Sequence, residues 1–343
     1  MFLLRSVALS DLKDIHELSR LMNFINLPSN IEQLESLILK SNKTFLNPSK
    51  KLEQNYYMFV VEDLINKRVV GTSLIHAQHG TPEEPHFYLR VGQEYKFSQT
   101  LNTGFVHGTL KLGIDTNGPT EIGALLLNPS MRSNGQKIGK QISFVRFLYL
   151  SMYPDRFRPK IHAELMPPFD SEGNSPLWEA IGRRFLNMDY FDADELSRKN
   201  KEFILSLYPS ENIYQTLLPT EARVAIGQVG ESTIPVKKML EDIGFQYINE
   251  VDPFDGGPHF QCPVNMIKPI KDKIHGKVKA LSPNIPLDDL SDYLLELPKY
   301  EGHHFTALKT KIIYKDSTLF VPSEILEKFP DLESELSFSA IPF

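Results

Sequence analysis

The sequence predicts an α+β fold in which a mixed central sheet is flanked by helices. Three observations support this class. A short apolar run at Ile122–Leu127 leads through a polar turn into a helical pattern. Two β-prone runs, Tyr57–Glu62 and Val69–Ala77, are separated by a turn-forming segment, which is a hairpin pattern. A helix followed by glycine and phenylalanine ends near Phe245, and a similar unit ends near Phe185, so we expect a weak internal repeat.

The stretch from Glu121 to Tyr153 is the centre of this prediction. Its apolar run is too short for a helix, and we expect a strand buried on both faces that ends at Asn128-Pro129. A glycine-containing turn follows at 132–135. From Lys137 the apolar residues recur at helical spacing, at Ile138, Ile142, Val145, Leu148 and Met152. Exposed amides before a helix N-terminus bind anions, because the N–H groups and the helix dipole both point at the loop. Phosphate is the expected ligand.

The other elements follow from periodicity, capping residues and glycine or proline punctuation. Further strands are expected at 2–7, 87–91, 160–165, 245–248, 306–314 and 318–321. Helices are expected at 10–22 with Ser10 as N-cap, and at 31–39, 175–182, 192–207, 210–218, 233–244 and 323–328. We expect a loop region between 92 and 119, and a connection at 283–289.

Composition and charge exclude several classes of protein. A net charge of −6 offers no basic stripe, so no nucleic acid partner is expected. No window approaches the roughly 18 apolar residues of a membrane span, so no membrane is expected. The only cysteine, Cys262, excludes an intramolecular disulfide and a cysteine-rich zinc cluster, and it indicates a cytoplasmic location. His303-His304 lacks the spacing of a helical metal pair, so no metal site is expected.

The order of elements resembles the GCN5-related N-acyltransferase (GNAT) fold. The signature of that family, Arg-x-x-Gly-x-Gly or Ala, follows the central strand, and its amides hold the pyrophosphate of coenzyme A. This chain keeps Arg132 and Gly135 but has Lys137 at the final position. The resemblance implies that an acyl-CoA is bound by the strand end and the turn, at Leu125, Leu126, Leu127, Arg132, Gly135 and Lys137.

Over nearly its whole length the chain resembles the bacterial arginine N-succinyltransferase family. The residues that carry the resemblance lie at 125–129 with Arg132 and Gly135, at 175–178 through Phe185, and at 188–190, 226–229, 240–245, 254–258 and 303–305. The resemblance implies transfer of succinyl from succinyl-CoA, or another acyl from its CoA thioester, to the α-amine of L-arginine or a related amine. It implies no permanently bound cofactor, and it implies a homo-oligomer.

The same resemblance divides the chain into three parts. Residues 1–190 would form the GNAT-like acyl-CoA-binding part, and 191–275 a helical segment with the second, half-GNAT-like unit. Residues 276–343 would form a small β-rich tail subdomain.

One position departs from the family. Family members have a histidine after Ile226-Gly227-Gln228-Val229, regarded as the catalytic proton donor, and this chain has Gly230 there. Two alternatives to the family activity therefore stay open. The chain is a non-catalytic or regulatory relative that binds acyl-CoA or an amino acid, or it is an acyltransferase with a different amine acceptor.

Several residues are candidates for the missing proton transfer. Acyl transfer to an amine needs a base, because an α-amine with a pKa near 8 is mostly protonated at neutral pH. Glu121 and Glu164 lie at strand ends where this fold often keeps a carboxylate; the alternative is that both are solvated charges. Glu231, Ser232 and His259 are further candidates.

The substrate's charged groups need partners of opposite charge. A guanidinium prefers a planar carboxylate, and Asp255 is the main candidate because flanking glycines let the backbone approach a ligand. The alternative is that Asp255 closes its own turn. Asp189, Asp192 and Asp194 are also available for the guanidinium, and Arg90, Arg183 and Arg184 for a succinyl carboxylate.

Overall fold

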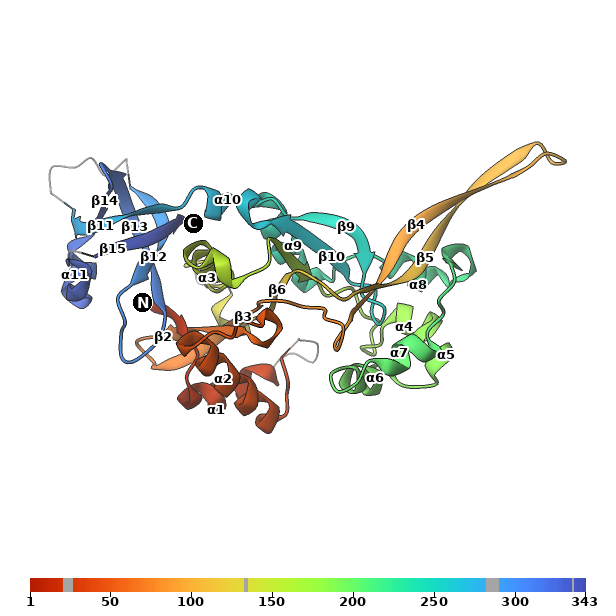
Figure 1. Ribbon diagram of the computed structural model, residues 1–343, viewed down its shortest axis with the longest axis horizontal. Coiled ribbons are helices and arrows are strands. Elements are labelled where there is room, and N and C mark those ends of the chain that lie inside the picture. Colours follow the sequence, from red (N-terminus) through yellow and green to blue (C-terminus); the bar gives the residue numbers. More distant parts are fainter. Residues whose placement is uncertain (21–26, 133–134, 282–289, 335) are drawn as a thin grey trace. The chain divides into compact units, whose positions relative to one another are not determined.

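The computed structural model describes residues 1–20, 27–132, 135–281, 290–334 and 336–343 (Figure 1). The predicted helix end at Leu21 or Met22, the turn residues Ser133 and Asn134, and the predicted connection at 283–289 lie outside these residues. The chain forms two compact units, each discontinuous in sequence. The first contains residues 1–78, 120–161 and 263–343, and the second contains 79–119 and 162–262. The three-part division expected from the sequence stays a prediction.

The first unit is built on a mainly antiparallel sheet. Its first four strands are neighbours in the order β1 (Phe2–Ser6), β2 (Tyr56–Asp63), β3 (Arg68–His76) and β6 (Thr120–Leu127). Helices α1 (Leu12–Ser19) and α2 (Ile31–Leu46) cover one face of these strands, and α3 (Ile138–Met152) covers the other (Figure 1). All residues of β2 from Tyr57 to Val61 are buried, as expected for a strand with both faces covered.

C-terminal strands complete the first unit. They are β11 (Ile274–Ala280), β12 (Ser291–Leu297), β13 (Thr306–Lys315), β14 (Thr318–Val321) and β15 (Ser337–Pro342), accompanied by helices α10 (Lys268–Lys271) and α11 (Ser323–Lys328). β13 pairs antiparallel with β1, so the two ends of the chain share one sheet. β12 and β15 also pack against α3.

Helix α3 is buried on almost every side. Nearly all residues from Ile138 to Ser151 are buried, including Arg146, whose pKa burial lowers to about 9. Its guanidinium donates to the Ser143 carbonyl at 3.0 Å and to Ser143 Oγ at 2.7 Å, so the buried cation keeps hydrogen-bond partners. The predicted helix is confirmed, and it is buried on almost every side because strands from the C-terminal part also pack against it.

The second unit contains its own sheet and most of the short helices. Its strands are neighbours in the order β7 (Lys160–Glu164), β10 (Pro258–Pro263), β9 (Gln246–Val251), β4 (His86–Ser98), β5 (Thr103–Asp115) and β8 (Ile213–Tyr214), and the chain enters the unit along β7. Its helices are α4 (Pro176–Ala180), α5 (Gly182–Leu186), α6 (Tyr190–Ser197), α7 (Glu202–Leu207), α8 (Thr220–Ala225) and α9 (Ile234–Asp242). Trp178 is fully buried and stacks on Phe254 with ring centroids 4.9 Å apart.

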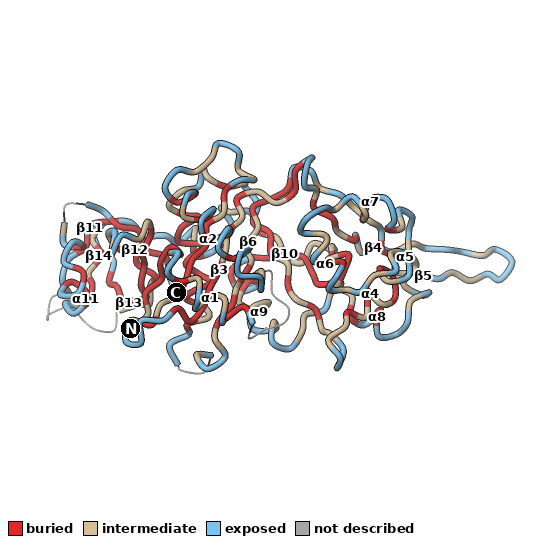
Figure 2. Tube along the Cα trace, turned by 90° about the horizontal axis from the view of Figure 1, so that it is seen from below, coloured by how far each residue is buried: buried red, intermediate tan, exposed pale blue. Residues whose placement is uncertain are grey.

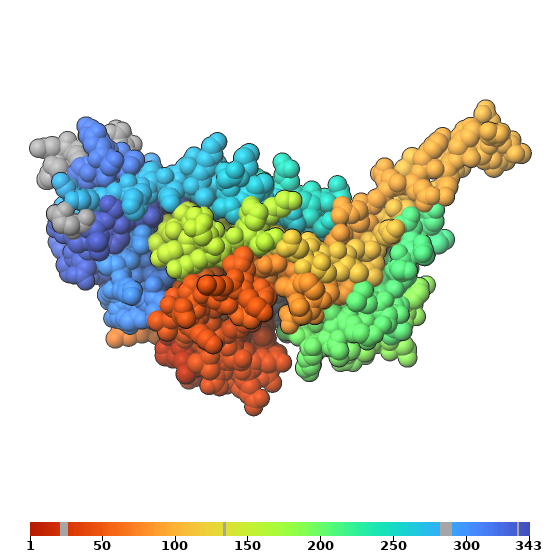
Figure 3. All heavy atoms as spheres, viewed as in Figure 1, coloured from red at the N-terminus to blue at the C-terminus, as the bar shows by residue number. Residues whose placement is uncertain are grey.

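A long hairpin extends from the second unit. β4 and β5 pair without interruption from His86–Asp115 to Ser98–Thr103. The distal half projects beyond the body of its unit and is largely exposed (Figures 2 and 3). Large apolar side chains gather there, at Tyr95, Phe97, Leu101, Phe105 and Val106, each more than half exposed.

Most predicted elements are confirmed. Ser175 caps α4 by accepting from the Trp178 N–H at 3.1 Å, and Pro176 is the first helical residue, as the sequence predicts. Gly182 does not close that helix; it begins α5, which ends at Asn187 in the left-handed conformation. Ser10 is not an N-cap, because a 3-10 turn at Leu9–Asp11 precedes α1.

Two larger predictions are wrong. The region expected to be a loop between 92 and 119 is mostly the β4–β5 hairpin. The helix expected at 210–218 is absent from this described segment, which forms the short strand β8 and a 3-10 turn at Gln215–Leu217. None of the helices in the described ranges combines the length and apolarity that crossing a bilayer requires.

A buried ion pair near the N-terminus gives the first prediction. Arg5 and Asp11 are almost fully buried and form two N–H···O bonds of 2.7 and 2.8 Å, and Asp11 also accepts from the Ala8 N–H. Asp11→Ala should cost about 3 kcal/mol or more of unfolding free energy in urea titrations, because it leaves a buried cation short of a partner. Glu17→Ala is the matched control, since Glu17 pairs with half-exposed Arg68 and should cost less than about 1 kcal/mol. Equal losses in the two variants would contradict the role of burial.

Candidate active site

A bulge opens the centre of strand β6. Gly123 lies opposite Leu74 and Leu126 lies opposite Thr72, so two residues of β6, Ala124 and Leu125, face one residue of β3. Ala124 has a φ of 46°, a left-handed conformation that is uncommon for alanine. Thr72 Oγ1 donates to the Ala124 carbonyl at 3.0 Å and holds this kink in place.

One side of β6 is also less buried than the sequence predicts. Glu121, Gly123 and Leu125 are half-buried, whereas Ile122, Ala124, Leu126 and Leu127 are buried. The expectation of a strand buried on both faces is therefore wrong. Before the bulge, Glu121 and Gly123 lie on the same side of the strand, and both are only partly buried.

The loop after β6 leads directly to the N-terminus of α3. Asn128 Oδ1 accepts from the Ser130 N–H at 3.0 Å, which starts a 3-10 turn at Pro129–Met131. Arg132, Gly135 and Lys137 are exposed. A Cβ added at Gly135 would meet nothing within 4 Å, and both Gly135 and Lys137 have positive φ values, of 74° and 56°.

This geometry fits an anionic ligand. The first helical hydrogen bond of α3 runs from the Gln141 N–H to the Lys137 carbonyl at 3.1 Å. The N–H groups of the first turn therefore lie outside the helical ladder and point toward the loop. Together with the dipole of this 15-residue helix they favour a phosphate group.

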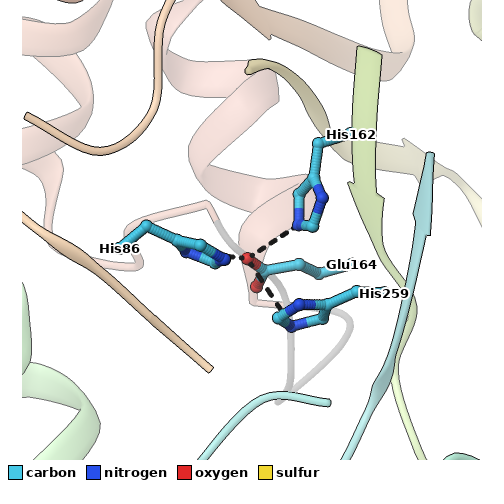
Figure 4. A group of neighbouring side chains, drawn as sticks. All are labelled: His86, His162, Glu164 and His259. Atoms are coloured by element: carbon cyan, nitrogen blue, oxygen red, sulfur yellow. Dashed lines mark ion pairs between the residues drawn. The ribbon is translucent and has the colours of Figure 1, made fainter. Parts of the chain in front are cut away.

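The second unit brings Glu164 together with three histidines. Glu164 Oε1 lies 3.4 Å from His162 Nε2, 3.6 Å from His86 Nδ1 and 4.0 Å from His259 Nε2 (Figure 4). The histidine side chains are between 0 and 7% exposed, and that of Glu164 is 19% exposed. The sequence predicted Glu164 and His259 separately; it gave no signal for His86 or His162, because nothing local relates 86 to 162.

The charges in this group influence one another. Burial raises the pKa of Glu164, but the His162 hydrogen bond and the neighbouring imidazoles outweigh it and hold this pKa well below its usual range. Burial, and then the neighbouring His79, lower the pKa of His86 well below its usual range. Glu164 is thus an ionised carboxylate rather than the solvated charge that the sequence left as an alternative.

Gly230 occupies a crowded position. Its N–H donates to the Met166 carbonyl at 2.9 Å, and a Cβ built there would lie 2.9 Å from the Pro167 carbonyl oxygen. Any larger residue therefore has to displace the Pro167 carbonyl. Glu231 and Ser232, the neighbouring candidates, are exposed in a 3-10 turn.

Asp255 closes the turn in which it lies. Its Oδ1 accepts from the Gly257 N–H at 2.7 Å, and Tyr190 donates its hydroxyl to Oδ2 at 3.5 Å. Burial raises the pKa of Asp255 to about 7, and burial together with Asp255 raises that of Asp252 well above its usual range. Asp255 therefore closes its own turn through Oδ1, which was the alternative to binding a substrate. Its other carboxylate oxygen, Oδ2, faces Tyr190 and not the turn.

The other charged candidates are mostly engaged. Asp189 pairs with Arg183, which also binds Glu179, and Asp194 pairs with Arg198 at 2.8 Å. Arg90 pairs with Glu250 at 2.6 Å. Asp192 and Arg184 are exposed on the helical part of the second unit.

Comparisons with known proteins identify relatives along nearly the whole chain. The family model described as arginine N-succinyltransferase beta subunit matches residues 2–269. The arginine N-succinyltransferase of Yersinia enterocolitica is 34% identical over 316 residues, which are 91% of this chain and 90% of that protein. The enzyme of that name from Shigella dysenteriae is 35% identical over 274 residues, 79% of this chain and 78% of its own.

A solved structure matches the fold. The arginine/ornithine succinyltransferase subunit AI from Pseudomonas aeruginosa is 25% identical, with a TM-score of 0.82 over 99% of this chain and 98% of that one. The predicted GNAT-like α+β class, with its β-rich C-terminal region, is confirmed. The fold and the site therefore define a CoA-dependent N-acyltransferase that takes an acyl-CoA as co-substrate. Within this class, the chain belongs to the arginine N-succinyltransferase family.

The close contact at Gly230 gives the second prediction. Gly230→His and Gly230→Ala should each lose about 1 to 3 kcal/mol of unfolding free energy, because both add a Cβ against the Pro167 carbonyl. Gly139→Ala is the control, since its Cβ would lie 3.7 Å from Leu127 and should cause no loss. If both Gly230 variants kept the wild-type free energy of unfolding in urea titrations, the prediction would be contradicted. The 166–168 backbone would then move to make room for the Cβ without destabilising the protein.

Proposed function

We propose that this protein transfers a succinyl group from succinyl-CoA to the α-amine of L-arginine. The observation that carries the proposal is the likeness to the arginine/ornithine succinyltransferase subunit over 99% of the chain. The family match over residues 2–269 supports it independently of the fold comparison. The single cysteine, which is buried, is compatible with a reducing compartment, and we place the reaction in the cytoplasm.

The first unit supplies the acyl-CoA contacts in this proposal. The diphosphate binds at the exposed turn of Arg132, Gly135 and Lys137, against the first turn of α3. The pantetheine arm runs along the backbone of Leu125, Leu126 and Leu127 at the end of β6, since the side chains of Leu126 and Leu127 are buried in the core. Since glycine or alanine usually ends this signature, the lysine at 137 adds a positive charge beside the bound phosphates.

The bulge in β6 supplies the polarising group. We assign the oxyanion donor to the Leu125 N–H, because the bulge takes two residues of β6 out of regular pairing with β3. A hydrogen-bond donor placed at the developing oxyanion stabilises the transition state by about 2.7 to 4 kcal/mol. The amine nitrogen forms a bond to the thioester carbon, the C–S bond breaks, and coenzyme A leaves as a thiol after taking up a proton.

We assign Glu121, rather than Glu164, as the general base that removes the proton of the attacking amine. Glu121 is half-buried on β6 and lies on the same side of the strand as Gly123, just before the bulge. Glu164 is enclosed by three histidines within 4.0 Å, whereas Glu121 lies on the same strand as the proposed oxyanion donor. Glu121 also has a histidine, His76, within 4.8 Å, which could pass on the proton. Loss of the family histidine at Gly230 then costs only part of the rate, since positioning and the oxyanion donor are kept.

We assign Asp255 as the residue that binds the guanidinium group of arginine, the acyl acceptor. Its carboxyl lies in a buried turn with Asp252, and its pKa of about 7 means that a bound cation would favour the ionised form. Ornithine is the first alternative acceptor to test, because the matched Pseudomonas aeruginosa subunit is described as acting on both amino acids. The second candidate function, a non-catalytic acyl-CoA-binding relative, is favoured by one observation, the crowded Gly230.

A thiol-release assay tests this proposal. Purified protein should release coenzyme A from succinyl-CoA only when arginine is present, and a panel of acyl-CoAs and amines should rank succinyl-CoA and arginine first. If no pair releases thiol while coenzyme A still raises the melting temperature, the non-catalytic alternative holds. The variant Gly230→His is then assayed in the same way. If it releases thiol and the wild type does not, the chain is a former enzyme that is inactive because it lacks this histidine.

The same assay locates the base. Glu121→Gln should lower kcat by about 10² to 10⁴ with little change in the melting temperature. Glu53→Gln, which changes a carboxylate in a 3-10 turn of the same unit, is the control. If Glu121→Gln stays active and a folded Glu164→Gln does not, the role belongs to Glu164.

We also propose that the protein is a homo-oligomer whose contact is the distal β4–β5 hairpin. Tyr95, Phe97 and Val106 lie on one face of the hairpin, because Tyr95 pairs with Val106 and residues two apart share a face. Each is more than half exposed, and apolar surface of this kind often marks a contact with another chain. A second copy is the chosen occupant, because the matched Pseudomonas aeruginosa chain is described as a subunit.

Light scattering after gel filtration tests this assembly. The wild type should elute as a dimer or larger, and Phe97→Ser combined with Val106→Ser, two residues on the same face of the hairpin, should reduce the mass to that of one chain. Ile65→Ser, at an 80% exposed residue of the first unit, is the control. A monomeric wild type would contradict the assembly, and a double variant that keeps the wild-type mass would remove the hairpin from the contact.

A further inference from the structure

The second unit contains a group of side chains that the acyl-transfer chemistry does not use. His86 begins β4, His162 and Glu164 lie two residues apart on β7, and His259 lies on β10. Residues two apart on a strand point to the same face, so His162 and Glu164 necessarily converge. β10 is the neighbour of β7, and the Leu165 N–H donates to the Pro258 carbonyl at 3.1 Å, which places His259 beside that pair.

From this arrangement we propose that His86, His162, Glu164 and His259 bind one divalent transition-metal ion of the zinc class. Each residue offers one nitrogen or carboxylate oxygen, and these four atoms all lie within 4.8 Å of one another. Figure 4 shows the three imidazoles directed at the carboxylate from three sides. The inference goes beyond the proposed acyl transfer and does not depend on it.

The distances agree with a four-coordinate site after small side-chain rotations. Zinc binds nitrogen at about 2.0 to 2.1 Å, so the ligand atoms of a tetrahedral site are about 3.3 to 3.5 Å apart. Glu164 Oε1 already lies 3.4 Å from His162 Nε2 and 3.6 Å from His86 Nδ1, and 4.0 Å from His259 Nε2. The four ligand atoms are at most 4.8 Å apart, so binding of a metal would draw them closer together.

The donor set selects the class of metal. Imidazole nitrogens suit zinc, cobalt, nickel and copper, whereas magnesium and calcium prefer oxygen ligands throughout. Four protein ligands complete a tetrahedral shell and leave no open position, which is typical of a structural zinc site and not a catalytic one. The expected role is to join β4, β7 and β10, which come from distant parts of the sequence.

The surroundings include groups that can orient the ligands. Gln261 Nε2 lies 3.2 Å from His162 Nδ1. A 180° rotation of this carboxamide would place its oxygen there, where it can accept the Nδ1–H when His162 Nε2 binds a metal. His79 Nε2 lies 3.0 Å from His86 Nδ1. Metal binding at His86 Nδ1 would therefore replace this contact, so His79 is not needed for the site.

Without a metal, the same side chains would form a buried network of one carboxylate and three imidazoles. Burying an ionised carboxylate is costly unless its charge is compensated, and a divalent cation compensates it most completely. The two arrangements differ in one measurable respect, which is uptake of metal.

The experiment uses the full-length chain without an affinity tag, stripped with a chelator and then supplied with zinc sulfate alone. We expect one zinc per chain after gel filtration, a higher melting temperature that returns to its starting value with chelator, and the intense visible absorption of four-coordinate cobalt when Co²⁺ replaces zinc. Glu164→Gln and His259→Gln should each weaken binding by at least about 100-fold. His79→Gln and His107→Gln, in the same unit, should leave it unchanged.

Three outcomes would overturn the proposal. The first is a stripped wild type that takes up no zinc and shows no cobalt absorption. The second is uptake that survives both ligand substitutions, because the metal would then lie elsewhere. The third is loss of binding in His107→Gln to the same extent. Should the ligand variants fail to fold by circular dichroism, the cobalt spectrum of the wild type decides alone. Failure here leaves thiol release untouched, so the two proposals are separable.

Discussion

The burial of α3 on almost every side is the constraint on which the first unit depends. Strands β2, β3 and β6 cover one side of the helix, and β12 and β15 cover another. A helix enclosed in this way cannot shift along its axis without breaking several packed surfaces. Its N-terminus is therefore fixed at the end of β6, which is where an anion-binding loop needs a rigid support. The buried Arg146, bonded only within its own helix turn in the described contacts, adds to the cost of moving it.

The second unit contains a crowded glycine and a group of titratable side chains. Where the family has a histidine, Gly230 packs against the 166–168 backbone, and the space that a side chain would need is filled. Just before the 166–168 segment, at the end of β7, Glu164 is surrounded by three histidines. The sequence did not predict that these four residues lie together.

Much of this fold could be predicted from the sequence, for identifiable reasons. β6 and α3 follow from a short apolar run, a turn and a helical period, and α4 follows from Ser175 and Pro176. The β4–β5 hairpin could not be predicted in this way, because its distal half is exposed on both faces and has no alternating pattern to read. The all-round burial of α3 also escaped prediction, since the strands that cover it come from the far end of the chain.

Some residues of the candidate site could be predicted from the sequence, and others could not. Leu125, Arg132 and Gly135 are contiguous along the chain, so a motif could locate them. The bulge at Ala124 could not be located, because alanine is an unusual residue for a positive φ. The histidine group is formed by three strands from distant segments, and only tertiary structure brings such residues together.

Hydrogen exchange of the protein with and without desulfo-CoA tests the central claim most directly. The account predicts slowed exchange at the backbone amides of residues 135–140, the turn and the first turn of α3, with β13 and β14 unchanged. Binding of desulfo-CoA, verified by calorimetry, without protection of these amides would contradict the claim that the start of this buried helix holds the diphosphate.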